Sequence, residues 1–280
     1  MSSGPTSVTA TLGYFTDPPK GERAFWTINV DEKTGQRRKN FDYDQHEVVI
    51  ENIRGGKEHE VNFEKNGFEF FHRPSGCSSF DDDEVIEREY YPECERIFKE
   101  VTGGSRAVLF DHTIRRRRPG QIDNGPKNRQ PVTEVHVDQT TASSIARVHR
   151  HLPAEDAKEL VNKRFQIVNL WRPIEETAID WPLALCDYRS TEPKKDVFPV
   201  ALVYPDREGE TLGVKYNSKH KWRYLYGMTP DECAVFKCFD SRQDGSVAVF
   251  APHTAFKDPT TPTGTPFRQS IEVRALVFHD

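Results

Sequence analysis

Residues 266–278 alternate between apolar and polar side chains. In an extended strand successive side chains point to opposite faces, so this pattern predicts a strand with two unlike faces. One face would carry Phe267, Ile271, Val273, Ala275 and Val277, with Gln269 as the exception. The other would carry Arg268, Ser270, Glu272 and Arg274. Such a polar face can point to water in an open sheet, or it can line the interior of a barrel that binds a charged ligand.

Short apolar or alternating stretches bounded by turn residues predict strands along most of the chain. They lie at 11–15, 24–30, 46–51, 63–72, 107–114, 165–173, 183–188, 198–204, 210–216, 221–226, 234–240 and 247–250. Helices are predicted at 81–101, 142–150 and 153–165. Many short strands with polar turns favour a mainly β fold with flanking helices, a jelly roll or a related architecture.

The predicted helix at 81–101 has one apolar face, so we expect it to pack against the sheet. We divide the chain into an N-terminal β-rich extension with this helix, residues 1–105, and a jelly-roll core, residues 106–280. A length of 280 residues suits one compact domain that includes both parts.

The net charge of −5 argues against nucleic acid or an anionic membrane as a partner, because either would favour a basic surface. The five cysteines form no CxxC pair, and we interpret them as reduced thiols. No signal-peptide pattern or membrane-spanning run is evident. We therefore expect a cytoplasmic enzyme that acts on a small molecule, with a homodimer as an option.

A candidate metal site begins at His136-Val137-Asp138. In a strand, residues two apart leave the same face, so the imidazole and the carboxylate would lie side by side. His253 could supply a third ligand. Two histidines and one carboxylate bind one face of non-haem Fe(II) and leave the other face open.

These motifs together, His136-Val137-Asp138, the distant His253 and Arg268-Gln269-Ser270, resemble the iron and 2-oxoglutarate-dependent oxygenase superfamily. Within it, residues 169–173, 251–256 and 268–274 resemble the fungal hydroxylase/desaturase family. That family is related to gibberellin desaturase and to the small subunit of the cephamycin methoxylation system. The resemblance covers roughly the last two-thirds of the chain.

The resemblance implies a double-stranded β-helix (jelly-roll) core, Fe(II), 2-oxoglutarate, O2 as cosubstrate and a small organic substrate, and it suggests fungal secondary metabolism. It also implies that Arg268 and Ser270 hold the distal carboxylate of 2-oxoglutarate. An arginine suits this task because its planar fork pairs with a carboxylate through two hydrogen bonds. Arg274 is the chief rival, and Glu272 could pair with either arginine.

Four further residues are candidates for contacting the substrate or supporting the site. The resemblance suggests Asn169 and Arg172. Arg115 belongs to the run Arg115–Arg118 and could face a carboxylated substrate, although a solvated basic loop is an equal interpretation. Trp222 could stack on a substrate, although aromatic residues in strands more often pack in the core.

Two other classes of function remain open on the sequence. A jelly-roll hydrolase or isomerase could use the same metal ligands without 2-oxoglutarate, and it would form no succinate. In a non-enzymatic β-sandwich binding module, replacing either histidine with alanine would leave the metal content and the ligand binding unchanged. Within the oxygenase interpretation, hydroxylation, desaturation, epoxidation and ring closure all begin with the same hydrogen abstraction, so the reaction and the substrate stay open.

Overall fold

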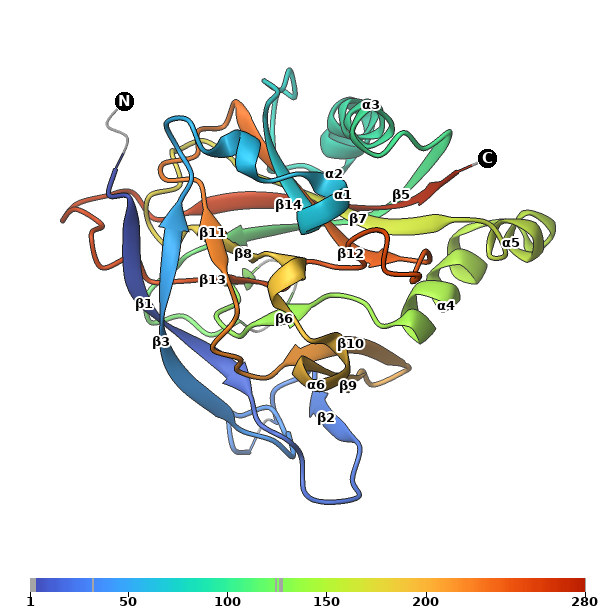
Figure 1. Cartoon of the computed structure of the whole chain (residues 1–280), viewed down its shortest axis with the longest axis horizontal. Coiled ribbons are helices and arrows are strands. Elements are labelled where there is room, and N and C mark those ends of the chain that lie inside the picture. Colours follow the sequence, from blue (N-terminus) through green and yellow to red (C-terminus); the bar gives the residue numbers. More distant parts are fainter. Residues whose placement is uncertain (1–3, 32, 124, 126–127, 280) are drawn as a thin grey trace.

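The computed structural model describes residues 4–31, 33–123, 125 and 128–279. Its strands form two sheets that face each other. The smaller sheet has the strand order β4-β12-β7-β14-β5 (Figure 1). These strands are β4 (Phe68–His72), β12 (Glu232–Asp240), β7 (Phe165–Pro173), β14 (Gln269–Phe278) and β5 (Arg106–Arg116).

The larger sheet has nine strands in the order β1-β3-β11-β8-β13-β6-β10-β9-β2. Its first five strands are β1 (Ser7–Phe15), β3 (Tyr43–Asn52), β11 (Trp222–Tyr224), β8 (Leu183–Cys186) and β13 (His253–Ala255). The others are β6 (His136–Val137), β10 (Glu208–Val214), β9 (Val197–Val203) and β2 (Ala24–Thr27). Residues before 105 thus add strands to both sheets.

Most of the alternating stretch at 266–278 becomes β14, an interior strand that is paired on both sides. Ser270 lies opposite Arg115 of β5, and Glu272 lies opposite both Thr113 of β5 and Trp171 of β7. Residues directly opposite in a ladder share a face, so the polar side chains of three strands gather on one surface. That surface faces the larger sheet and lines a pocket between the two sheets.

The apolar face of β14 points outward and is covered by helix, as its sequence pattern predicted. Ile271, Val273, Ala275 and Val277 are buried together with side chains of the helical segment 83–102. That segment consists of α2 (Asp83–Val85), a π-helical turn η2 (Ile86–Tyr90) and α3 (Tyr91–Thr102). It ends at Gly103, whose positive φ of 70° suits glycine. Figure 1 shows α3 lying over the smaller sheet.

The remaining helices are short. Those longer than four residues are α4 (Thr141–His151) and α5 (Ala154–Leu160). The others are η1 (Glu58–Glu60), α1 (Phe63–Asn66), η4 (Tyr188–Ser190) and α6 (Pro193–Asp196).

Three predicted elements differ from the structure. The expected strand at 63–72 begins as α1, because Asn62 caps the backbone N–H groups of Glu64 and Lys65. The expected helix at 153–165 ends at Leu160, and Phe165 already starts the fully buried β7. The expected strand at 247–250 is irregular: the backbone N–H of Ala248 donates to a carbonyl of α1 rather than to a strand.

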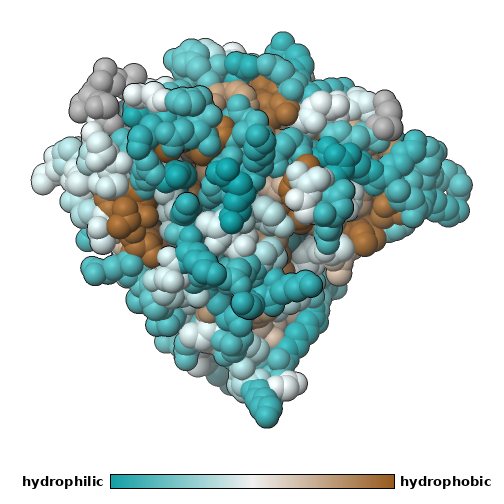
Figure 2. Space-filling model, in the orientation of Figure 1, coloured by the Kyte–Doolittle hydropathy of each residue, from teal (hydrophilic) through white to brown (hydrophobic). Residues whose placement is uncertain are grey.

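Aromatic and aliphatic side chains of both sheets fill the space beside the pocket and form a common core. The face of the molecule in Figure 2 is mostly hydrophilic, with apolar side chains in small separate patches. Within the described residues, no helix is long and apolar enough to cross a membrane.

A buried ionic cluster joins β12 to the start of β7. The fully buried Lys237 donates to Asp240 at 2.9 Å, and Arg164 and Gln166 donate to the same carboxylate oxygen at 2.7 and 2.8 Å. Glu64 of α1 lies 3.2 Å from the Lys237 ammonium. Burial alone would raise the pKa of Asp240, but Arg164 and Lys237 outweigh it and hold this pKa below its ordinary value.

Replacing Asp240 with asparagine should lower the free energy of unfolding by about 3 kcal/mol at pH 7, because the buried Lys237 ammonium loses the nearer of its two carboxylate partners. A depressed pKa stabilises the native state fully above the unfolded pKa of about 3.9, and this contribution is lost as the pH falls through the folded pKa. The difference between the two proteins, measured by urea denaturation, should therefore shrink in acid. The exposed Glu155, which pairs with Lys158, is the control, and its glutamine variant should change little. Equal effects at both sites would contradict this account.

Candidate metal centre and adjoining pocket

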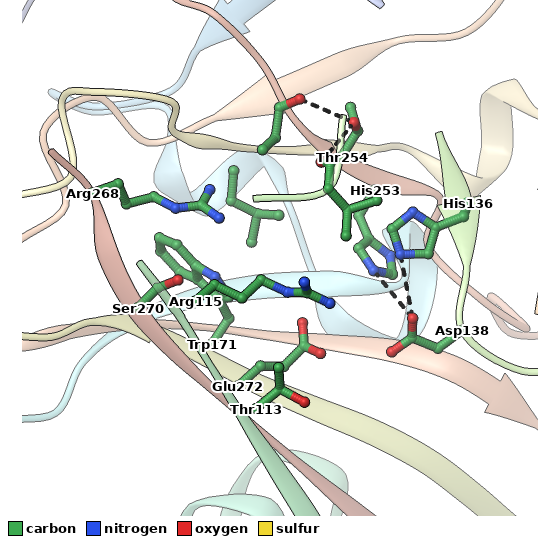
Figure 3. A pocket seen from close by; sticks show the side chains of 13 residues that line it. Thr113, Arg115, His136, Asp138, Trp171, His253, Thr254, Arg268, Ser270 and Glu272 are labelled. Atoms are coloured by element: carbon green, nitrogen blue, oxygen red, sulfur yellow. Dashed lines mark hydrogen bonds and ion pairs between the residues drawn. The ribbon is translucent and has the colours of Figure 1, made fainter. Parts of the chain in front are cut away.

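His136, Asp138 and His253 meet at one end of the pocket between the sheets (Figure 3). His136 and His253 lie directly opposite each other on the paired strands β6 and β13. Oδ1 of Asp138 lies 3.3 Å from Nε2 of His136 and 3.8 Å from Nε2 of His253. All three donor atoms lie within 4.8 Å of one another, a separation that lets one metal ion contact all three.

The bend after β6 places Asp138 differently from the predicted strand. The strand comprises only His136 and Val137, and Asp138 follows it at a bend. Val137 is fully buried, and Thr140 caps α4 by accepting from the N–H of Ser143. The carboxylate is therefore fixed between a buried strand residue and a capped helix, and it still shares the pocket with His136.

Backbone carbonyls fix both imidazoles in the tautomer that a metal requires. Nδ1 of His136 donates to the carbonyl of Glu134 at 2.8 Å, and Nδ1 of His253 donates to the carbonyl of Ala251 at 3.1 Å. Nε2 of each ring is then turned toward Asp138, where it can bind a metal. Burial, together with the nearby His136, lowers the pKa of His253 to about 3, which keeps that ring neutral.

The carboxylate of Asp138 divides its two oxygens between the histidines and the smaller sheet. Oδ2 accepts from Nε of Arg274 at 3.0 Å and from Nδ2 of Asn169 at 2.8 Å, so Oδ1 is left facing the histidines. Burial would raise the pKa of Asp138, but Arg274 and the two histidines outweigh it and hold the pKa well below its usual range. An ionised carboxylate with one oxygen available fits a cationic metal.

Arg268 and Ser270 lie in the same pocket, away from the metal-binding end (Figure 3). Nη1 of Arg268 donates to the carbonyl of Trp181 at 2.6 Å, while its buried Nε has no partner within the described residues. Leaving a buried charged donor unpaired is costly, so this guanidinium fits an anionic ligand. Burial, with the charge of Arg115, lowers the pKa of Arg268 to about 9, and the group stays cationic at neutral pH.

The other predicted site residues divide into two groups. Arg115 lines the pocket, and Asn169 and Arg274 support it through Asp138. Arg274 also contacts Asp111 at 3.0 Å and pairs with Glu272, so its guanidinium is already occupied by carboxylates.

Arg172 and Trp222, two candidates for contacting the substrate or supporting the site, do not line the pocket. Arg172 lies opposite Ile271 on the outer face of the smaller sheet, with its guanidinium 5.2 Å from the ring centroid of Tyr90. Trp222 lies opposite Cys186, on the face of the larger sheet away from His253, and donates to the hydroxyl of Tyr14 at 2.9 Å.

Sequence reasoning missed several residues of the pocket wall. Besides Glu272, which was expected on the inward face, the further lining residues are Thr113, Val132, Trp171, Leu183, Thr254 and Ala255. Two of them carried a usable signal: Trp171 follows Asn169 by two positions, and Thr113 precedes Arg115 by two, so strand alternation alone puts each on the same face as a predicted site residue. The others depend on pairings between distant segments.

Comparison with known proteins agrees with this geometry. A family profile described as "Oxidoreductase/YMDC permease-like domain" matches residues 12–278. The Fe(II)/2-oxoglutarate-dependent dioxygenase nvfI of Aspergillus novofumigatus is 32% identical over 271 residues, 94% of each chain. The hydroxylase/desaturase efuI of Hormonema carpetanum is 32% identical over 84% of each chain, and the hydroxylase/desaturase CTB9 of Cercospora beticola is 33% identical over 95% of this chain and 85% of that protein.

A solved structure titled iron and alpha-ketoglutarate-dependent endoperoxidase NvfI superposes with a TM-score of 0.86 at 29% identity, covering 98% of both chains. The chain thus belongs to the oxidoreductase family that this profile describes. Its relatives include fungal Fe(II)/2-oxoglutarate-dependent dioxygenases and hydroxylase/desaturases. It is an Fe(II)/2-oxoglutarate-dependent dioxygenase with the predicted jelly-roll fold, and its cofactors are Fe(II) and 2-oxoglutarate, with O2 as cosubstrate.

Replacing Asn169 with alanine should weaken Fe(II) binding about 10- to 100-fold, because Oδ2 of Asp138 loses one of its two nitrogen donors from the smaller sheet. Anaerobic equilibrium titration with Fe(II) measures this affinity.

The matched control is Asn66→Ala. Asn66 donates to the buried carboxylate of Asp187 at 2.9 Å, and neither residue lines the pocket. This variant should lose stability but keep its Fe(II) affinity. Unchanged affinity in the Asn169 variant, or an equal loss in both variants, would show that Asn169 does not position Asp138.

Proposed function

We propose that this enzyme oxidises a C–H bond of a small organic molecule, with Fe(II) held by His136, Asp138 and His253. Arg268 and Ser270 hold the distal carboxylate of 2-oxoglutarate. The observation that carries this proposal is the layout of the pocket. The possible metal ligands His136, Asp138 and His253 meet at one end of the pocket. The buried Arg268, whose Nε has no hydrogen-bond partner within the described residues, lies toward the other end.

When bound, Fe(II) and 2-oxoglutarate supply the activation of O2 that removes a hydrogen atom from the substrate. The side chains of the chain orient and shield these groups. Arg268 fixes the distal end of the cosubstrate, so that its keto-acid end points toward the triad. Arg274 and Asn169 keep Asp138 ionised and aligned. Trp171 and Leu183 exclude water from the pocket wall.

The contacts of the two candidate arginines favour Arg268 over Arg274 for the cosubstrate, and only Arg268 of the two lines the pocket. The guanidinium of Arg274 contacts Asp138, Asp111 and Glu272. A ligand carboxylate at Arg274 would have to displace one of these partners. The Arg268 guanidinium donates to the carbonyl of Trp181 and lies 5.5 Å from the ring centroid of Trp171, so a ligand carboxylate there would displace no ion-pair partner of the guanidinium within the described residues.

The relatives support a role in fungal secondary metabolism. Two carry the name hydroxylase/desaturase, another is titled an endoperoxidase, and a 40% identical match over 145 residues is named Aspirochlorine biosynthesis protein N. We assign this chain to the same kind of task, hydroxylation, desaturation or a related C–H oxidation. We also place it in the cytoplasm, and its five free cysteines agree with a reducing compartment.

Anaerobic titration of the apoprotein with Fe(II) and then 2-oxoglutarate should produce the weak visible charge-transfer band of the metal-bound keto acid. His136→Ala should abolish the band, because one metal ligand is lost. Arg268→Met should keep the band but raise the 2-oxoglutarate concentration needed for half saturation at least about tenfold, because the distal carboxylate loses charge-assisted hydrogen bonds.

Arg172→Met is the matched control, because Arg172 is as buried as Arg268 but lies on the opposite face of the neighbouring strand. It should destabilise the protein without changing the half-saturation concentration. No band in metal-loaded wild type would contradict the proposal and favour a hydrolase or isomerase that uses the same metal ligands.

A further inference from the structure

A second arginine, Arg115, faces the pocket, and the proposed function assigns it neither the metal nor the cosubstrate. Arg115 lies on the inner face of β5, opposite Ser270, and its side chain is 17% exposed. Figure 3 shows its guanidinium pointing into the pocket, between Arg268 and Asp138 and above Glu272. It therefore lies where a molecule next to the metal would pass.

Most of the N–H donors of the Arg115 guanidinium have no hydrogen-bond partner within the described residues. Nη1 donates to the carbonyl of Gln130 at 2.8 Å, and the same atom lies 3.9 Å from Asp123. Asp123 also lies 3.6 Å from Arg37. Both arginines are therefore too far from the Asp123 carboxylate for a hydrogen bond. Within the described residues, Nε and Nη2 of Arg115 have no partner. A guanidinium in this state fits an anionic oxygen group that arrives with a ligand.

The charges that line the pocket lead to the same conclusion. Two arginines, Arg115 and Arg268, and two carboxylates, Asp138 and Glu272, line the pocket. Both carboxylates pair with Arg274, so Arg115 and Arg268 have no carboxylate of the pocket as a partner. A carboxylate that arrives with a ligand can therefore pair with Arg115 without displacing a carboxylate of the pocket.

We propose that Arg115 binds a carboxylate of the substrate, so that the enzyme acts on an organic acid. This inference rests on the proposed function, because Arg268 and the metal already take both ends of 2-oxoglutarate. The neighbouring wall contains Val132, Trp171 and Leu183, which suit a hydrocarbon body attached to the carboxylate. Arg115 is thus a specificity-determining residue that orients the acid beside the metal-binding end.

The test compares an acid with its uncharged amide in the anaerobic Fe(II) and 2-oxoglutarate complex of the full chain. The probes are 4-phenylbutyrate and 4-phenylbutyramide, and calorimetry measures their binding. Wild type should bind the acid at least about tenfold more tightly than the amide, since a charge-assisted pair is worth more than a neutral hydrogen bond. Arg115→Met should lose this preference, and Arg115→Lys should keep part of it.

Arg116→Met is the control. Arg116 is the next residue of β5, and its guanidinium contacts Gln269 at 2.6 Å and Asp81, neither of which lines the pocket. This variant should keep the wild-type preference for the acid. Thermal denaturation of all the variants separates loss of binding from loss of folding, and the lysine variant covers the case in which the methionine variant does not fold.

Two results would overturn the inference. If wild type binds the acid no better than the amide, or binds neither, Arg115 does not recognise a substrate carboxylate. If Arg115→Met weakens 2-oxoglutarate binding tenfold or more, the carboxylate at Arg115 belongs to the cosubstrate. Both results are distinguishable from failure of the proposed function, because the charge-transfer band of the wild-type complex reports on that function separately.

Discussion

The hydrogen-bonded ion pair between Asp138 and Arg274 connects the two sheets at the metal-binding end of the pocket. Asp138 follows a strand of the larger sheet, whereas Arg274 and Asn169 belong to adjacent strands of the smaller sheet. Because both donors contact Oδ2, the other oxygen points at the histidines. The geometry of the centre therefore depends on how the sheets pack against each other, and not on the His-x-Asp segment alone.

The same constraint explains the sequence of β14. Its inner face has to carry charges, and its outer face has to pack against the helical segment 83–102. Strand alternation satisfies both requirements at once. A one-residue slip of register would turn the arginines into the helix-packed core and bring apolar side chains to the metal. Pairing with β5 and β7 on both sides fixes the register.

Much of this arrangement could be predicted from the sequence because it depends on local periodicity. The two faces of residues 266–278 and the packing of the helix near residue 90 on the sheet follow from patterns of two or 3.6 residues. The preference for Arg268 over Arg274 rested on the family resemblance, because local periodicity cannot separate the two. Both point inward, and only the pairing of distant segments shows that Asp138 and Glu272 occupy Arg274.

The positions of Arg172 and Trp222 outside the pocket could not be predicted for the same physical reason. Arg172 precedes a proline at the end of a strand that is buried on both faces, so no alternation of apolar and polar residues marks its inner side. Trp222 stands on a three-residue strand, too short for a periodic signal. In both cases the face is set by the strand partner, Ile271 for Arg172 and Cys186 for Trp222.

The most direct measurement is a crystal structure with Mn(II) in place of Fe(II) and the unreactive analogue N-oxalylglycine in place of 2-oxoglutarate. The account predicts a metal bound by Nε2 of His136, Nε2 of His253 and Oδ1 of Asp138, with the distal carboxylate of the analogue hydrogen bonded to Arg268. A metal bound by other side chains, or a distal carboxylate placed away from Arg268, would contradict it.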